Sequence, residues 1–85
     1  MAVATPSPTP NPNALKFDLD APLASSMNVT SAEAAAGNPF AEAVFEAGGV
    51  VSVFGVNDFV TVTREPDADW DAIVAAVQAA AEAYL

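Results

Sequence analysis

Residues 50–64 carry the sequence VVSVFGVNDFVTVTR, which decides the fold of this chain. The segments 50–54 and 59–64 are rich in β-branched and aromatic side chains, which favour extended strands. Between them lie residues 55–58, GVND, which are prone to form a turn. The whole stretch therefore predicts a β-hairpin.

Two more strands are expected before the hairpin. Residues 14–20, ALKFDLD, alternate apolar and polar side chains with the period of a half-buried strand. Residues 26–30, SMNVT, alternate again, with Met27 and Val29 as the apolar pair. Pro22 lies in the interruption between the two segments, so we expect an antiparallel pair joined by an irregular loop.

Two helices are indicated by their end signals. Asn38 can cap a first helix that has Pro39 at its first position, and Gly48-Gly49 can stop it. Asp69 can cap a second helix, whose alanine-rich interior favours helical structure. Its apolar stripe, at spacings of three and four, consists of Trp70, Ile73, Val74, Val77, Ala81 and Tyr84.

The predicted order is β-β-α-β-β-α. Two helices can cover only one face of a four-stranded sheet, so we expect a two-layer α+β fold with an antiparallel sheet and both helices on one side. The side chains expected to face the helices are Leu15, Phe17, Leu19, Met27, Val29, Val51, Val53, Val60 and Val62. Those expected on the opposite, open face are Lys16, Asp18, Asn28, Thr30, Ser52, Phe54, Phe59, Thr61 and Thr63.

Residues 1–13, MAVATPSPTPNPN, are punctuated by proline, which fixes φ and lacks an N–H group. We expect them to form a flexible tail that ends in an Asn-Pro-Asn turn, followed by a single domain over residues 14–85. Residues 1–10 contain no Lys, no Arg and no apolar run, unlike a signal or transit peptide. A cytoplasmic location is therefore expected.

The charge is lopsided, because eleven acidic residues face only Lys16 and Arg64, for a net charge of −9. Nucleic acid and anionic membranes are excluded as partners, since binding to phosphate depends on Lys and Arg. The acidity has two interpretations: attraction to a basic partner surface, or plain solubility and adaptation to high salt. We expect a monomer.

The chain contains no cysteine and no histidine. Thiolate or imidazole ligation of a metal or an iron–sulfur cluster is therefore closed to this chain acting alone, and so are Ser-His and Cys-His nucleophiles. Residues 67–71, DADWD, imitate the start of a calcium loop, but Ala72 and Gln78 stand where that loop needs Gly and Glu. We expect no catalytic residue, no metal ligand and no cofactor. A carboxylate-only metal enzyme remains a rival hypothesis, although Glu42 and Glu46 are expected on a solvated helix surface.

Phe54 and Phe59 flank the hairpin turn. If both are exposed beside Lys16, they form an apolar patch with one cation, which suits a protein partner. Alternatively, the twist of the strands tucks one or both rings under a loop or the proline-rich tail. Asp58 in the turn and Arg64 at the end of the hairpin are also candidate contacts.

The turn formed by Asn11, Pro12 and Asn13 is the other candidate binding element. Proline limits the freedom of the chain, and asparagine side chains can bond their own backbone to fix a turn. The turn either positions the first strand or displays Asn11 and Asn13 as a rigid recognition loop. Both interpretations stay open at this point.

Several stretches resemble the N-terminal domain of the Nfu/NifU proteins. Residues 9–17, TPNPNALKF, resemble its opening motif T-P-N-P-N-x-L-K-F, and residues 49–54, GVVSVF, resemble its G-V-x-x-V-F strand. Residues 58–64, DFVTVTR, resemble its D-F-I-T-V-T-K strand. Residues 39–45, PFAEAVF, are similar to its S-P-L-A-x-x-L-F helix, with Asn38 where Ser is usual. The resemblance covers residues 9–85 and implies the same four-stranded antiparallel sheet with helices packed on it.

The resemblance also implies a function. Nfu proteins assemble and hand on iron–sulfur clusters, which a C-x-x-C motif holds in a separate C-terminal domain. A chain without cysteine cannot take over that ligation. What the resemblance implies here is a non-catalytic accessory domain that binds an iron–sulfur scaffold or client protein. The alternative is a protein-binding or regulatory module of the same fold with no link to iron–sulfur chemistry.

Overall fold

The computed structural model describes residues 2–23 and 26–85, and within them the chain forms five strands and two helices. The strands are β1 (Ala4–Pro8), β2 (Ala14–Leu19), β3 (Met27–Val29), β4 (Val50–Val56) and β5 (Phe59–Arg64). The helices are α1 (Pro39–Phe45) and α2 (Trp70–Tyr84). Neither helix in this part of the chain is long and apolar enough to cross a membrane.

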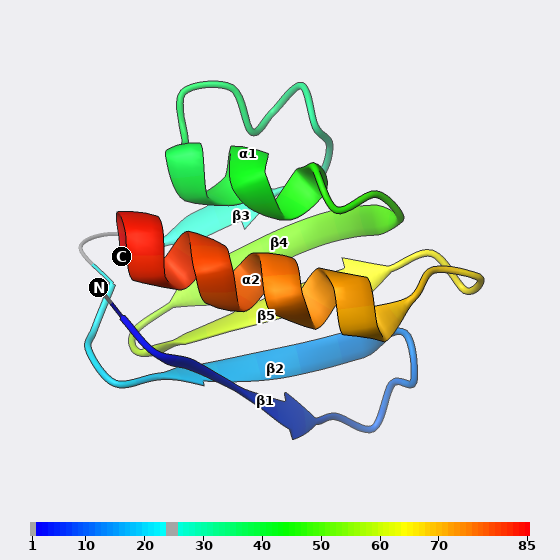
Figure 1. The fold of residues 1–85 in the computed structure, drawn as a ribbon, viewed down its shortest axis with the longest axis horizontal. Coiled ribbons are helices and arrows are strands. Elements are labelled where there is room, and N and C mark those ends of the chain that lie inside the picture. Colours follow the sequence, from blue (N-terminus) through cyan, green and yellow to red (C-terminus); the bar gives the residue numbers. More distant parts are fainter. Residues whose placement is uncertain (1, 24–25) are drawn as a thin grey trace.

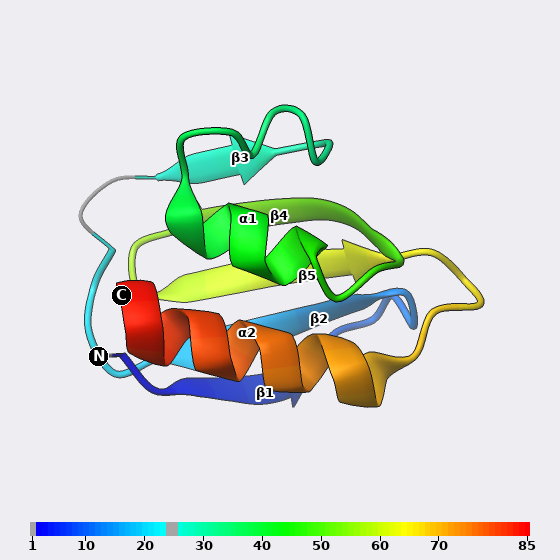
Figure 2. The same cartoon turned by 45° about the horizontal axis from the view of Figure 1, so that its top comes forward.

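All strand pairs are antiparallel, and the order in the sheet is β1-β2-β5-β4-β3. Both helices lie on the same side of the sheet (Figures 1 and 2). The predicted α+β class and the two-layer arrangement are confirmed. The sheet has five strands among the described residues, rather than the four predicted from the sequence.

The additional strand is β1, where the sequence analysis expects a flexible tail. That expectation is wrong for residues 4–8, which pair with β2 from Ala4↔Leu19 to Pro8↔Leu15. Because β1 is an edge strand, its prolines are tolerated where their missing N–H groups would point away from the sheet. Pro6 and Pro8 are two residues apart, so both lack an N–H donor on the same, unpaired side of β1. On that side the Ala4 carbonyl accepts a hydrogen bond from α2.

The predicted hairpin is confirmed as β4 and β5, closed by the pair Val56↔Phe59. Asn57 supplies the turn with a positive φ of 55°, which asparagine tolerates better than most residues. An irregularity in the register between Val50 and Ser52 makes a bulge in β4. The prediction that Val51 faces the helices is wrong. Val51 is the extra residue of the bulge, so it does not follow the alternation of side chains along β4, and it is 43% exposed.

The core lies between the sheet and the two helices. Its largest fully buried side chains are Phe17, Phe40, Val44, Val53, Val60, Val62, Ile73 and Val77. Both predicted helix caps are confirmed. Asn38 Oδ1 accepts a hydrogen bond from the Ala41 N–H at 3.1 Å, and Asp69 Oδ1 accepts one from the Asp71 N–H at 2.9 Å. These caps fix where each helix starts and therefore which face it turns to the sheet.

Candidate functional site

The face of the sheet opposite the helices, called the open face below, carries three of the predicted contact residues. Thr61 on β5 is the direct cross-strand partner of both Lys16 on β2 and Phe54 on β4. Phe59 follows two positions away on β5, diagonal to both Lys16 and Phe54. Diagonal neighbours are within reach of long and aromatic side chains, so the three predicted residues form one surface.

Lys16 lies over Phe59. Its Nζ is 4.7 Å from the centre of the Phe59 ring and 3.4 Å from Asp18 Oδ1. The side chains of Lys16 and Asp18 remain 42% and 54% exposed, so water screens their charges and the ion pair adds little to stability. The main effect of the ion pair is to hold the Lys16 ammonium group over the face of the Phe59 ring, where it makes a cation–π contact.

The two phenylalanines differ in exposure. Phe54 is 43% exposed, whereas Phe59 is half-buried beneath Lys16. Because Phe54 is 43% exposed, it is not tucked under a loop or under the proline-rich segment. Phe54 is thus the accessible aromatic group of the open face, and Phe59 its partly covered neighbour.

Acidic groups gather near the Phe59 end of the open face. Asp18 is the direct cross-strand partner of Phe59, and the exposed Asp58 precedes Phe59 in the hairpin turn. The Asp58 carbonyl accepts a hydrogen bond from the Leu19 N–H at 2.8 Å, which fixes the turn against the end of β2. Val56, placed in the turn by the sequence analysis, is a strand residue that pairs with Phe59. Its β-branched side chain was the signal that favoured the strand.

The turn at residues 9–13 is held by its own side chains. Asn11 Oδ1 accepts a hydrogen bond from the Asn13 N–H at 2.9 Å, and the Ala14 N–H donates to the Asn11 carbonyl at 3.0 Å. Thr9 Oγ1 lies 2.8 Å from the Ala14 carbonyl oxygen and so closes the loop from the other side. The predicted asparagine-based turn is confirmed, and Thr9 is a member that the sequence analysis did not single out.

Arg64 belongs to this turn rather than to the open face. Its N–H donates to the Asn13 carbonyl at 2.7 Å, and its Nη1 donates to the Ala68 carbonyl at 2.7 Å. The guanidinium carbon lies 5.0 Å from the centre of the Trp70 ring, and Trp70 Nε1 donates to the Pro12 carbonyl at 3.3 Å. The half-buried Arg64 follows Val60 and Val62 on the helix-facing side of β5, so its first role is to fasten the chain.

The predicted contact residues therefore form two groups at different places. Lys16, Phe54 and Phe59 lie together on the open face, with Asp58 at its hairpin end. Asn11, Pro12, Asn13 and Arg64 meet at the opposite end of β2 and β5, where the chain enters β2 and leaves β5. Of the two groups, only the first presents a large exposed aromatic side chain.

The residue types do not fit a resident metal or cluster. The chain has no cysteine or histidine to supply thiolate or imidazole. Over residues 2–23 and 26–85, acidic side chains do not gather in groups of three or more that could hold a metal ion.

The sequence model of the N-terminal part of the scaffold proteins Nfu and NifU matches residues 5–85. The chain belongs to the Nfu/NifU N-terminal family. The matched range includes four of the five residues of β1, together with every other strand and both helices.

Two curated relatives come from Arabidopsis thaliana. NifU-like protein 4, mitochondrial, is 41% identical over 46 residues, and NifU-like protein 5, mitochondrial, is 44% identical over 46 residues. Each match covers 54% of this chain, but only 16% and 17% of the two relatives. This chain therefore corresponds to a small part of those longer proteins.

Solved structures share the fold. The crystal structure of protein SAV1430 from Staphylococcus aureus has a TM-score of 0.77 and 30% identity, over 94% of this chain and 98% of that one. A NifU-like protein from Saccharomyces cerevisiae has a TM-score of 0.75 over 94% of this chain and 75% of that one. Its 24% identity supports the likeness of fold alone.

Proposed function

We propose that this chain is a non-catalytic accessory domain that binds a protein partner during the assembly or transfer of iron–sulfur clusters. Membership of the Nfu/NifU N-terminal family, which is linked to that process, supports the setting. The absence of cysteine and histidine means that a cluster would be cargo held by the partner. The domain would then contribute affinity or orientation to a complex in which other residues carry the cluster.

The observation that carries this proposal is the exposure of Phe54 on the open face of the sheet. Aromatic residues dominate the energetics of many protein interfaces, because they bring a large apolar area at a small cost in side-chain entropy. Phe54 is flanked by Thr61 and by Asn28, its direct partners on β5 and β3. An apolar centre with a polar rim is the arrangement found in interfaces that form and dissociate.

Lys16 and Phe59 extend that centre. The Lys16 ammonium group lies over the Phe59 ring, so a partner that displaces it gains access to a second aromatic surface. The strands beneath these side chains are paired on both sides, which makes the surface rigid before binding. The net charge of −9 opposes association of one copy with another, so we propose a monomer that binds a different protein.

A two-dimensional amide NMR titration tests the proposal. The ¹⁵N-labelled chain is titrated with an Nfu-type C-terminal scaffold domain, once with its cluster and once without. We expect shifts of the amides of Lys16, Phe54, Phe59 and Thr61, with little change in the buried helix face. Shifts limited to residues 9–13 would instead favour the asparagine turn as the recognition element.

The result also separates the two candidate functions. Binding that strengthens when the scaffold carries its cluster would place the domain in cluster transfer, and binding to both forms alike would place it in assembly of the complex. If the amide signals do not shift even at near-millimolar concentrations of the scaffold domain, the proposed role in iron–sulfur cluster assembly or transfer is wrong. A protein-binding module of the same fold with an unrelated partner would then be the better explanation.

A further inference from the structure

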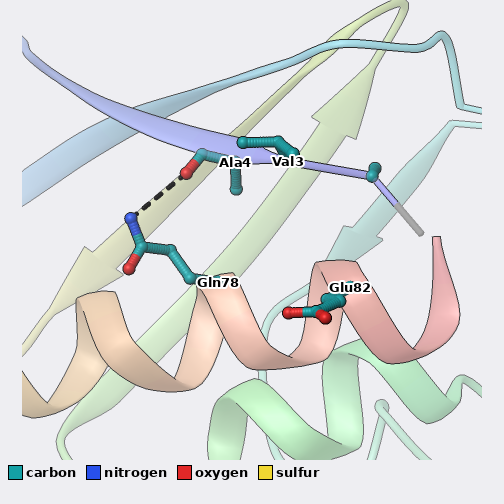
Figure 3. A pocket seen from close by; sticks show the side chains of 5 residues that line it. Val3, Ala4, Gln78 and Glu82 are labelled. Atoms are coloured by element: carbon teal, nitrogen blue, oxygen red, sulfur yellow. Dashed lines mark hydrogen bonds between the residues drawn. The ribbon is translucent and has the colours of Figure 1, made fainter.

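A groove runs between the start of the chain and the last turns of α2. Its lining consists of Ala2, Val3, Ala4, Gln78 and Glu82 (Figure 3). The groove belongs to β1 and the helix layer, whereas the open face lies on the opposite side of the sheet (Figures 1 and 2). A ligand in this groove would therefore leave the open face free.

One wall of the groove is formed by the chain at residues 2–4, and the Val3 side chain lies on the side of this segment away from α2 (Figure 3). Val3 is 61% exposed, which is the largest exposure among the big apolar side chains of the described residues. Ala2 and Ala4 beside it are buried, so the backbone that carries Val3 is packed against the protein. Hydrogen bonds from the Ala2 N–H to the Ala81 carbonyl, at 3.2 Å, and from the Val3 N–H to Asp20 Oδ1, at 2.9 Å, hold this wall in place.

The other wall is polar and accepts hydrogen bonds. Gln78 and Glu82 are four residues apart on α2, so their side chains project from the same face of the helix. Gln78 Nε2 donates to the Ala4 carbonyl at 3.3 Å, and this bond orients the amide and leaves Oε1 as an acceptor (Figure 3). Glu82 is exposed and makes no ion pair within the described part of the chain.

The chain's own cations are engaged elsewhere. Lys16 is on the open face beside Asp18, and Arg64 donates to the Ala68 carbonyl at the other end of α2. Glu82 therefore has no partner among the lysine and arginine side chains of its own chain, which are only these two.

We propose that this groove receives an arginine or lysine side chain from a basic segment of a protein partner. The aliphatic stem of such a side chain would lie along the backbone of residues 2–4, and its cationic head would reach Glu82 and Gln78 Oε1. The net charge of −9 draws a basic segment toward the domain, whereas an anionic ligand would be repelled. A purely apolar ligand would cover Glu82 without giving the carboxylate a partner.

The test uses the chain with a blocked tripeptide, Ala-Arg-Ala, as the probe. The control probe replaces arginine with citrulline, which keeps the length and planarity of the side chain but removes its charge. We expect arginine-dependent amide shifts at residues 2–4 and 78–82, and a much weaker response to the citrulline peptide. Glu82→Gln should weaken binding about three- to fivefold, the upper part of the range of an exposed ion pair.

The matched control is Glu33→Gln, which changes the net charge by the same amount on an exposed segment between β3 and α1. It should leave the affinity for the arginine peptide unchanged. Equal weakening by both variants would overturn the proposal, because it would show only general attraction to an acidic protein. Equal responses to arginine and citrulline would overturn it as well. Either outcome is independent of the scaffold titration, which reports on the open face.

Discussion

Trp70 Nε1 donates a hydrogen bond to the Pro12 carbonyl across 58 positions of sequence, at 3.3 Å. This bond joins the first residue of α2 to the turn that precedes β2. The Arg64 N–H fastens the same turn through the Asn13 carbonyl, and the Arg64 guanidinium group lies against the Trp70 ring. The asparagine turn is therefore fixed from β5 and from α2, and its shape is a property of the whole fold.

Trp70→Phe should lower the free energy of unfolding by about 0.5–1.5 kcal/mol, because it removes this hydrogen bond and keeps an aromatic ring. Trp70→Ala should cost more, since it also removes the ring that packs under Arg64. Urea unfolding followed by far-ultraviolet circular dichroism measures both. If Trp70→Phe is as stable as the parent protein, the contact with Pro12 has no energetic role.

Gly48 and Gly49 form a matched pair for substitution by alanine. Both have positive φ, 83° and 75°, so an alanine at either position is strained by about 1–2 kcal/mol. A Cβ at Gly48 meets open space, whereas one at Gly49 would collide with the Cβ of Ala68. We expect Gly49→Ala to cost about 1–3 kcal/mol more than Gly48→Ala in urea unfolding. Equal losses of stability in the two variants would mean that the segment around Ala68 shifts at no cost in free energy to make room for the added Cβ.

Val62 and Val51 test the bulge in β4. Val62 is fully buried, so Val62→Ala should lower the free energy of unfolding by about 2 kcal/mol. Val51 is 43% exposed on the bulge, and Val51→Ala should cost less than about 0.5 kcal/mol. Thermal or urea unfolding of the two variants gives the comparison. A large loss for Val51→Ala would place that side chain in the core, as a regular strand would require.

Local chemistry explains what could be predicted from the sequence. The hairpin, the cap residues Asn38 and Asp69, and the alternation of β2 all depend on neighbours within a few positions. The exposure of Phe54 follows from the alternation of side chains along β4. Arg64 was predicted as a contact residue. However, it lies at even spacing from Val60 and Val62 on β5, which already indicated that its side chain is on the side of the sheet that faces the helices.

Other features depend on residues that are far apart in sequence. Pro6 and Pro8 argue against a strand until the strand is known to lie at the edge of the sheet, and that position is set by the order of all five described strands. The same holds for the bond between Trp70 and Pro12 and for the groove that joins Val3 to Glu82. No local pattern indicates which distant segment a residue will meet.

Removal of residues 2–8 tests whether β1 is part of the folding unit. The segment buries Ala2 and Ala4 and pairs along β2, so its loss should lower the free energy of unfolding by on the order of 2 kcal/mol. Urea unfolding of the shortened chain, with Met placed before Thr9, measures the change. An unchanged midpoint would instead support a flexible tail joined to a domain of residues 14–85.

Phe54→Thr should weaken binding of the scaffold domain by about tenfold or more, while the fold and its stability stay nearly unchanged. Threonine suits a strand, and an exposed aromatic side chain contributes little to the core, so the free energy of unfolding should move by no more than about 0.5 kcal/mol. At an interface, truncation of a central aromatic residue commonly costs about 2 kcal/mol or more. Val51→Thr is the matched control, because Val51 is also apolar and 43% exposed but lies on the bulge. Isothermal titration calorimetry gives both affinities, and equal losses for the two variants would show that the partner does not dock on Phe54.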